Sequence, residues 1–382
     1  FEQLLQDQEA GTVRPVEEYC SQLPKEIQPL ASEYVSGVTW RPEDVSGSLH
    51  RAREVGDWLG TYRLIEPLGR GGQGIVYLAE DSRLQRRVAL KVLTAAGGPG
   101  SEQLVTRYQR EAAVASQLHH PGICAVHDAG VVDGIPYIAM QYIEGETLAE
   151  RIVSALEGSI LHEEQFQIDL DSAPHSEGDS ASTSVTRADV TIMIEIAEKA
   201  ARALHVANEA GIVHRDIKPG NIMIEASSGD PVILDFGLAR ADEGEFQTLT
   251  RTGDVFGTPA YMSPEQVLGE ARRIDRRSDI YSLGATLYEC LTLRRPIEAA
   301  TREALYKAIL VEDPPPARRL NPSVPRDLEV VLATSLEKEP NRRYQTALDF
   351  AEDLRRVRML EPIAAKPVGP LGRSLRWAKR RP

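Results

Sequence analysis

Apolar residues in the first third of the chain occur in short runs that are separated by glycine or polar residues. Runs of this kind, rich in β-branched and aromatic side chains, are typical of strands joined by turns. They are residues 62–68, 75–80, 88–93, 123–130 and 135–142. We therefore expect a small, mostly β domain over residues 58–143.

The later part of the chain has helical periodicity instead. In residues 190–205 apolar side chains recur every three or four positions, which predicts a long helix. Further helices are expected from residue 278 and over residues 347–360, so residues 144–360 should form a larger, mostly α domain. Within it, the Ser/Asp/Gly-rich composition of residues 155–188 predicts a flexible insertion. An untethered loop is the simplest interpretation of this insertion, and a docking or autophosphorylation site is the alternative.

Composition excludes several classes of protein. The formal charge of −13 argues against a nucleic-acid-binding protein, which would carry a basic surface. The three cysteines, Cys20, Cys124 and Cys290, are widely spaced, which indicates neither a disulfide framework nor a cysteine-rich zinc site. A reducing compartment follows as the simplest interpretation. No run of about 18 apolar residues is present in the sequence, so no membrane-spanning helix is predicted within it.

The two ends of the chain differ from its middle. Residues 1–57 are predicted to be a polar extension with one or two short helices, and a solvated extension is favoured over a regulatory module. Residues 361–382 form a basic tail that contains Trp377. Two interpretations of this tail stay open. It is either a solvated tail or a juxtamembrane segment, with a spanning helix after Pro382 that would make the chain the cytoplasmic domain of a single-pass inner-membrane protein.

Two short segments gather the residues that can carry chemistry. Asp216 and Asn221 lie in one, and Asp235 lies in the other, which follows closely. A carboxylate at the head of a loop can accept a proton from a hydroxyl group. A second carboxylate and an amide oxygen can hold a hard cation, which prefers oxygen ligands. The apolar residues 222–224 and 232–234 predict short buried strands around this site.

These segments resemble signature motifs of a known family. His214-Arg215-Asp216, with Asn221 after it, is similar to the catalytic loop of eukaryotic-type protein kinases, and Asp235-Phe236-Gly237 is similar to their metal-binding triplet. Lys218-Pro219 resembles the serine/threonine branch. The Ser-Pro-Glu triplet at residues 263–265, the N-terminal extension and the basic C-terminal tail resemble its bacterial members. The resemblance covers residues 58–355. It implies an α+β, bilobal protein-kinase fold, with a small, mostly β N-lobe (58–143), a larger, mostly α C-lobe (144–360) and ATP in the cleft.

A glycine-rich segment in the β part extends the resemblance. G-x-G-x-x-G also occurs in dinucleotide-binding folds, where it leads from a strand into a helix. Here an apolar, β-branched run follows the glycines, which favours a strand-turn-strand hairpin over phosphates and opposes a nucleotide-binding oxidoreductase. The resemblance implies ATP contacts at this loop, at neighbouring strands and at the hinge, with Met140 as gatekeeper. The residues implied are Gly69, Arg70, Gly71, Gly72, Gln73, Gly74, Val76, Ala89, Lys91, Met140, Gln141, Ile143, Asn221 and Asp235.

A lysine and a glutamate complete the implied catalytic set. Lys91, in a strand that resembles V-A-I-K, is expected to contact the α- and β-phosphates. Glu111, within a helix predicted over residues 101–118, is its expected ion-pair partner. Asp216 would act on the substrate hydroxyl, and Lys218 would offset charge on the transferred phosphoryl group. Asn221 and Asp235 would coordinate Mg²⁺, with Mn²⁺ as the alternative ion.

The segment after the metal-binding triplet resembles an activation segment that ends in Ser263-Pro264-Glu265. Thr250 and Thr252 match the positions of phosphorylated threonines in bacterial members, and Thr258 matches the threonine that contacts the catalytic aspartate and lysine. Phosphorylation would place charge near Arg215. A transient homodimer is one arrangement that would allow this modification in trans.

Two further structural roles are implied by the resemblance. Asp279 would brace the backbone of the catalytic loop. Glu265 would form an ion pair with Arg343, with Arg342 as the alternative partner.

The predicted function is ATP-dependent phosphorylation of protein serine and threonine hydroxyls. The alternative is a scaffold that binds nucleotide and partners without catalysis. Such pseudokinases usually lack the lysine, the loop aspartate or the metal-binding aspartate, whereas this chain has all three as Lys91, Asp216 and Asp235.

Overall fold

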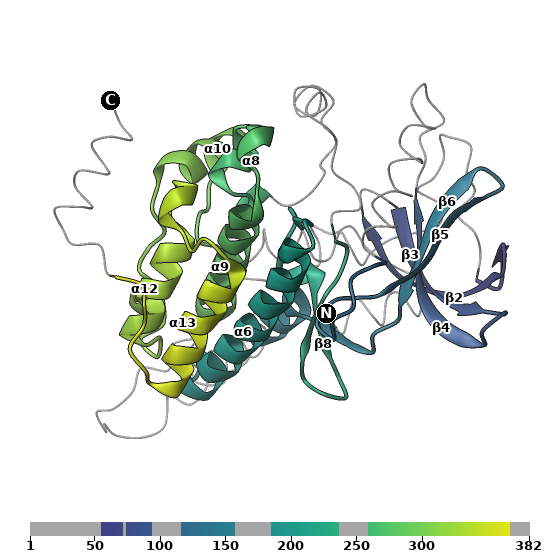
Figure 1. Cartoon of the computed structure of the whole chain (residues 1–382), viewed down its shortest axis with the longest axis horizontal. Helices are drawn as coiled ribbons and strands as arrows, with labels where there is room; N and C mark the ends of the chain where they lie inside the picture. The colour runs from purple at the N-terminus through teal and green to yellow at the C-terminus, as the bar shows by residue number, and fades with distance from the viewer. Residues whose placement is uncertain (1–54, 72–73, 94–115, 157–184, 237–258, 367–382) are drawn as a thin grey trace, which may run out of the picture. The chain divides into compact units, whose positions relative to one another are not determined.

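The computed structural model describes residues 55–71, 74–93, 116–156, 185–236 and 259–366 (Figure 1). The chain divides into two compact units. The first comprises residues 1–116 and 125–142, and the second comprises residues 117–124 and 143–382.

An antiparallel sheet in the order β1-β2-β3-β4-β6-β5 forms the described part of the first unit. Its strands are β1 (Trp58–Leu59), β2 (Tyr62–Gly71), β3 (Gly74–Asp81), β4 (Arg86–Leu93), β5 (Val126–Val132) and β6 (Ile135–Gln141). Alternate residues of these strands, including Leu64, Tyr77, Val88 and Leu90, are buried in one apolar cluster. Because successive side chains of a strand point to opposite faces, these residues give the sheet one buried face.

One predicted strand began too early. Residues 123–130 were expected to form a strand, but β5 begins at Val126. Ile123 instead makes an isolated bridge to Ile233, and Cys124 N donates to Ile233 O at 2.9 Å, so both residues belong to the second unit. Residues 123–126 are all apolar, so the sequence pattern does not show that the chain passes from the second unit to the first after Cys124.

The second unit is mostly helical in the part of the chain described. Its longer helices are α6 (Arg187–Glu209), α9 (Arg276–Thr292), α10 (Arg302–Val311), α12 (Arg326–Ser335) and α13 (Ala347–Met359). Its short helices are α8 (Pro264–Val267) and α11 (Ala317–Leu320), and its sheet comprises β7 (Gly145–Thr147), β8 (Ile222–Glu225) and β9 (Pro231–Ile233). The predicted strands at residues 222–224 and 232–234 are confirmed as β8 and β9.

Helix α6 shows why one predicted boundary was wrong. It begins at Arg187, inside the predicted insertion 155–188, because Thr186 and Asp189 form a capping box. Thr186 Oγ1 accepts from Asp189 N at 3.3 Å, and Asp189 Oδ2 accepts from Thr186 N at 2.9 Å. Residues 155 and 156 are also helical. The rest of the predicted insertion, the extension 1–54 and the tail from residue 367 lie outside the described residues.

Helix α9 forms the centre of the second unit. Residues Ser278 to Leu291 are all buried, as expected for a helix that is covered on every side. Figure 1 shows α9 among α6, α12 and α13, and α6 packs along α13. Buried side chains of these helices form one large apolar cluster that also includes Ile222 and Ile233. The strands that follow Asn221 and precede Asp235 are therefore anchored in the core of the second unit.

Gly284 allows α9 and α12 to approach closely. A Cβ atom at this position would overlap Ser335 Oγ and lie 2.8 Å from Ser335 Cβ. We expect Gly284→Ala to lower the free energy of unfolding by about 1–3 kcal/mol, because overpacking forces buried side chains apart. Chemical denaturation measures this loss. The same change in a Ser335→Gly background should cost less, whereas equal costs in both backgrounds would show that the steric explanation is wrong.

Candidate active site

A buried carboxylate of α9 holds the backbone of the predicted catalytic loop. Asp279 Oδ2 accepts from His214 N at 2.9 Å, and Asp279 Oδ1 accepts from Arg215 N at 2.8 Å. Arg215 has a left-handed backbone with φ of 67°, which is uncommon for a residue other than glycine. The paired N–H bonds stabilise this conformation. The predicted bracing role of Asp279 is confirmed.

Asp279 is completely buried, and its protonation reflects opposing effects. Burial raises the pKa of the Asp279 carboxyl above its ordinary value, while His214 and the donated N–H bonds act in the opposite direction. Asn208 of α6 also donates to Asp279 Oδ2, at 3.3 Å from its Nδ2. Sequence reasoning missed Asn208; the available signal was a polar residue four positions after Leu204 on the buried face of the helix.

His214 links the catalytic loop to the strand that precedes Asp235. Its Nδ1 accepts from Asp216 N at 3.2 Å, and its Nε2 lies 2.7 Å from Leu234 O. This pattern fits the tautomer with the proton on Nε2, because a carbonyl oxygen can only accept. The ring also meets Phe236 edge to face, with centroids 4.8 Å apart. The buried histidine thus fixes both predicted motifs to one another.

The Asp216 carboxylate is held by side chains of its own loop. Asp216 Oδ2 lies 3.1 Å from Asn221 Nδ2 and 3.2 Å from Lys218 Nζ. Asn221 Nδ2 also donates to Asp216 O at 2.8 Å. The Asp216 side chain is 32% exposed, so it is held in position and is still accessible to a substrate. The structure therefore brings three of the predicted catalytic and metal-binding residues together.

The oxygen donors of this loop fit a hard cation. Asn221 uses Nδ2 in both hydrogen bonds above, and its amide oxygen makes no hydrogen bond within the described part of the chain. Asp235 follows Leu234, whose N donates to Asn221 O at 2.9 Å, and it has a left-handed backbone with φ of 53°. Mg²⁺ is typically held by one or two such protein oxygens together with substrate phosphates and water. No group of three or more His, Cys, Asp or Glu side chains suited to a metal occurs in the described residues.

Lys91 and the glycine-rich segment lie in the first unit. Lys91 is 6% exposed and lies within β4, so its side chain is buried and does not face solvent as most strand lysines do. Strands β2 and β3 form an antiparallel hairpin in which Gly71 pairs with Gly74. Strand therefore follows strand here, as predicted, and the arrangement differs from the strand-helix turn of a dinucleotide-binding fold.

The remaining predicted ATP contacts of the first unit lie on the same sheet. Gly69 and Arg70 lie in β2, and Val76 lies in β3 opposite Lys91. Ala89 of β4 pairs with Met140 of β6, and Gln141 ends β6. Ile143 is buried in the second unit. The other predicted site residues lie outside the described residues: Gly72, Gln73, Glu111, Thr250, Thr252 and Thr258.

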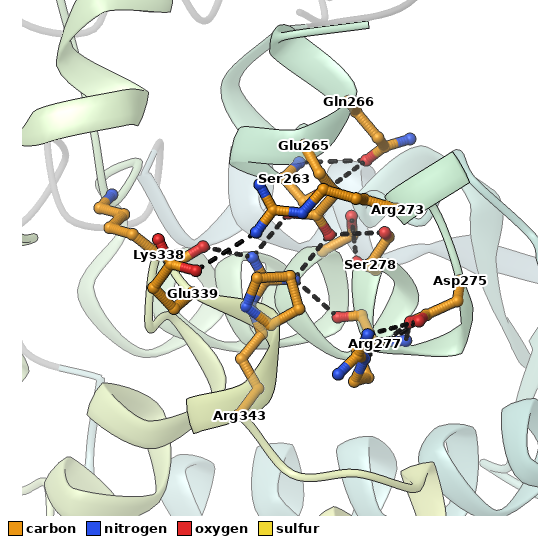
Figure 2. Close-up of polar contacts among 12 residues, drawn as sticks. Ser263, Glu265, Gln266, Arg273, Asp275, Arg277, Ser278, Lys338, Glu339 and Arg343 are labelled. Atoms are coloured by element: carbon orange, nitrogen blue, oxygen red, sulfur yellow. Dashed lines mark hydrogen bonds and ion pairs between the residues drawn. The ribbon is translucent and has the colours of Figure 1, made fainter. Parts of the chain in front are cut away.

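A buried ion pair lies next to a residue that contacts the catalytic loop. Glu265 Oε1 and Oε2 each lie 2.7 Å from a terminal nitrogen of Arg343, and Figure 2 shows the two side chains in contact. Ser278 Oγ donates to Glu265 Oε1 at 2.6 Å. The predicted pairing with Arg343 is confirmed, and the alternative partner Arg342 is wrong. The neighbouring Gln266 donates from Nε2 to Arg215 O at 2.8 Å and so joins this pair to the catalytic loop. Sequence reasoning missed this contact.

The ion pair makes the stability of the second unit depend on pH. Burial raises the pKa of Glu265, but the hydrogen bonds and charge of Arg343 outweigh this effect and hold the pKa below its ordinary value of 4.5. The unfolded chain therefore binds this proton more readily than the folded protein does. We expect the stabilisation from Glu265 to be lost as pH falls below 4.5. Unfolding curves over this range should have a shallower pH dependence in Glu265→Gln, and an unchanged slope would contradict the assignment.

Comparison with known proteins decides the family. A model described as the protein kinase domain matches residues 62–354. The chain belongs to the protein kinase family. Its α+β, bilobal fold class, predicted from the sequence, is thereby confirmed. The kinase domain of Mycobacterium tuberculosis PknI, solved by crystallography, has a TM-score of 0.57 and 25% sequence identity, covering 80% of this chain and 99% of that one.

Relatives of this kinase place it in the bacterial serine/threonine branch. It is 38% identical over 313 residues to the serine/threonine-protein kinase PknB of Mycobacterium tuberculosis, covering 80% of this chain and 44% of PknB. It is 36% identical over 296 residues to the serine/threonine-protein kinase PrkC of Bacillus subtilis, covering 78% of this chain and 40% of PrkC. The chain thus spans less than half the length of these relatives. None of its described helices is both long and apolar enough to cross a bilayer.

Proposed function

We propose that this chain transfers the γ-phosphate of ATP to serine and threonine hydroxyls of proteins. The observation that carries the proposal is the Asp216 carboxylate, held 3.1 Å from Asn221 Nδ2 and 3.2 Å from Lys218 Nζ on a loop that a buried aspartate braces. A partly exposed carboxylate in a fixed position is suited to orient a hydroxyl and accept its proton. Phosphoryl transfer depends mainly on such positioning and on electrostatic stabilisation.

The other residues have complementary roles in this proposal. Asn221 and Asp235 would hold Mg²⁺, which neutralises phosphate charge when bound. Lys91 would bind the α- and β-phosphates, with Glu111 as its partner. Lys218 would offset negative charge on the phosphoryl group during transfer. Mn²⁺ is the alternative ion, and replacing Mg²⁺ by Mn²⁺ in the assay distinguishes the two.

Phosphoamino-acid analysis tests the chemistry directly. Incubation of the chain with labelled ATP, Mg²⁺ and a mixed protein substrate should yield phosphoserine and phosphothreonine. Phosphotyrosine as the dominant product would contradict the branch assignment. Nucleotide binding without any phosphoryl transfer would support the scaffold alternative.

We further propose that phosphorylation of Thr250 and Thr252 activates the kinase, in trans through a transient homodimer. Arg215, next to Asp216, would bind the new phosphate as a charge-assisted partner. The double variant Thr250→Ala with Thr252→Ala should lose about tenfold or more in activity, equivalent to about 1.4 kcal/mol of catalytic stabilisation. Steady-state kinetics measures this loss. Ser227→Ala, outside the activation segment, should leave activity unchanged, and equal kinetics in the double variant and wild type would reject the proposal.

Attachment to a membrane through sequence that follows Pro382 is also a proposal. It is supported by the basic character of residues 373–381, because clustered Lys and Arg next to a membrane favour an anionic lipid surface.

A further inference from the structure

The second unit contains a cavity that the proposed catalytic chemistry does not use. Its volume is about 310 Å³, and its lining residues include Asp313, Pro315, Ala333, Leu336, Glu337 and Lys366. They come from the loop between α10 and α11, from α12 and the residues that directly follow it, and from the segment after α13. This volume is near the lower end of sites that take small ligands or anchoring side chains.

The walls of the cavity are fixed by hydrogen bonds. Tyr288 of α9 donates from its hydroxyl to Pro315 O at 2.9 Å, which ties the proline-rich loop to the core. Glu329 Oε1 accepts from Arg318 N at 3.3 Å, which joins α12 to α11. Burial raises the pKa of Tyr288 to about 12, so its hydroxyl stays a donor at neutral pH. The cavity is therefore part of the folded unit.

Charge and polarity define what the cavity can bind. The lining includes Asp313, which is exposed, and Glu329, which is partly exposed, so it carries negative charge at the surface, whereas proline, alanine, valine and leucine side chains supply apolar surface. Lys366 is the cationic residue of this lining. A segment that combines apolar side chains with several positive charges would match both properties.

The chain itself leads such a segment to the cavity. Asp353 is completely buried in α13, and its two carboxylate oxygens accept from Ala364 N at 2.7 Å and from Ala365 N at 2.9 Å. Tyr344 OH and Arg356 Nη1 donate to the same carboxylate, at 3.0 Å and 2.9 Å. The residues immediately before Lys366 are thus fixed, and Lys366 itself lines the cavity.

We propose that this cavity is the docking site of the chain's own basic segment, residues 367–381. This segment lies outside the described residues, and its sequence contains Val368, Leu371 and Trp377 without any acidic residue. Its basic residues are Arg373, Arg376, Lys379, Arg380 and Arg381.

Covalent connection favours this intramolecular contact. A short linker produces an effective concentration in the millimolar range, so even a weak intrinsic affinity suffices for docking. The docked segment would pair its cations with the carboxylates and place an apolar side chain between α12 and the proline-rich loop. The proposal is independent of the proposed kinase activity.

Trypsin cleavage of the full chain tests the docking, with release of tail peptides followed by mass spectrometry. Bonds after Arg373, Arg376 and Lys379 should be cleaved about tenfold more slowly in the folded chain than in a synthetic peptide of residues 367–382, which corresponds to about 1.4 kcal/mol. Raising the ionic strength to about 1 M, where charges are screened beyond about 3 Å, should reduce the difference. If the tail bonds of the folded chain were cleaved at the rate of the free peptide, the proposal would be wrong and the segment would not occupy the cavity.

A matched pair of variants tests the location. Ala333 lies exposed on α12 at the cavity, and Ala304 lies exposed on α10 and does not line it. Ala333→Trp should fill the cavity and raise tail cleavage to the rate of the free peptide, whereas Ala304→Trp should leave it as in wild type. Equal protection of the tail in both variants would show that the segment does not dock in this cavity. The comparison of wild type with the free peptide remains decisive if a variant fails to fold.

Discussion

Replacing Asp216 by Asn is expected to lower the rate of phosphoryl transfer by about 10²- to 10⁴-fold, the usual contribution of a general base. The amide has nearly the shape of the carboxylate but cannot accept the hydroxyl proton, and it removes the charge that Lys218 Nζ meets at 3.2 Å. Single-turnover kinetics with saturating Mg²⁺-ATP measures the chemical step. The midpoint of thermal unfolding should change little, because the Asp216 side chain is already 32% exposed.

Asp230→Asn provides the matched control. Asp230 also accepts from a lysine, Lys199 Nζ at 2.6 Å, but it lies on the surface outside the catalytic loop. This variant should keep wild-type kinetics. If Asp216→Asn also retained the wild-type rate, the assignment of Asp216 would be wrong.

Replacing Arg343 by Ala is expected to lower the free energy of unfolding by about 3–5 kcal/mol, because it leaves the Glu265 charge buried without its partner. Arg343 is 3% exposed and also donates to backbone oxygens of Arg277, Glu337 and Lys338. Several buried carbonyl groups would lose their donor at the same time. Arg343→Lys should recover only part of the loss, since an ammonium group cannot reproduce the planar, bidentate contact.

Arg273→Ala is the comparison that separates burial from ion pairing as such. Arg273 pairs with Glu270 at 2.7 Å, but its side chain is 48% exposed. Surface pairs of this kind contribute less than about 1 kcal/mol. Urea denaturation of both variants should therefore give clearly different midpoints. Similar losses would contradict the view that desolvation of Glu265 dominates the cost.

Local motifs explain why much of the fold and site could be predicted from the sequence. Short apolar runs rich in β-branched residues identified the strands around Lys91, and helical periodicity identified the centre of α6. Asp216 and Asn221 are only five residues apart in the sequence, which favours contact between their side chains. The 3.1 Å hydrogen bond from Asn221 Nδ2 to Asp216 Oδ2 agrees with this. Resemblance to the kinases added contacts between distant residues, such as those of Asp279 with the catalytic loop.

Other features depend on tertiary contacts that leave no periodic signal. Ile123 was assigned to a strand of the first unit because its run is apolar, yet it belongs to the second unit, where it forms a bridge to Ile233, a residue far away in the sequence. The contact from Gln266 to Arg215 O joins residues that are far apart in sequence and was not anticipated. The hydrogen bonds that Asp353 accepts from Ala364 N and Ala365 N were also missed. From sequence alone, an aspartate within an amphipathic helix is expected to face solvent, and nothing in the sequence shows that the segment after the helix folds back onto it.

Intact mass of the purified chain, before and after incubation with Mg²⁺-ATP, tests the central claim most directly. Wild-type protein is predicted to gain mass in steps of one phosphate group, at Thr250 or Thr252, while Asp216→Asn gains none. Equal mass gain in both proteins would show that Asp216 does not carry the reaction. No gain in either protein, even with a protein substrate present, would contradict the assignment of kinase activity.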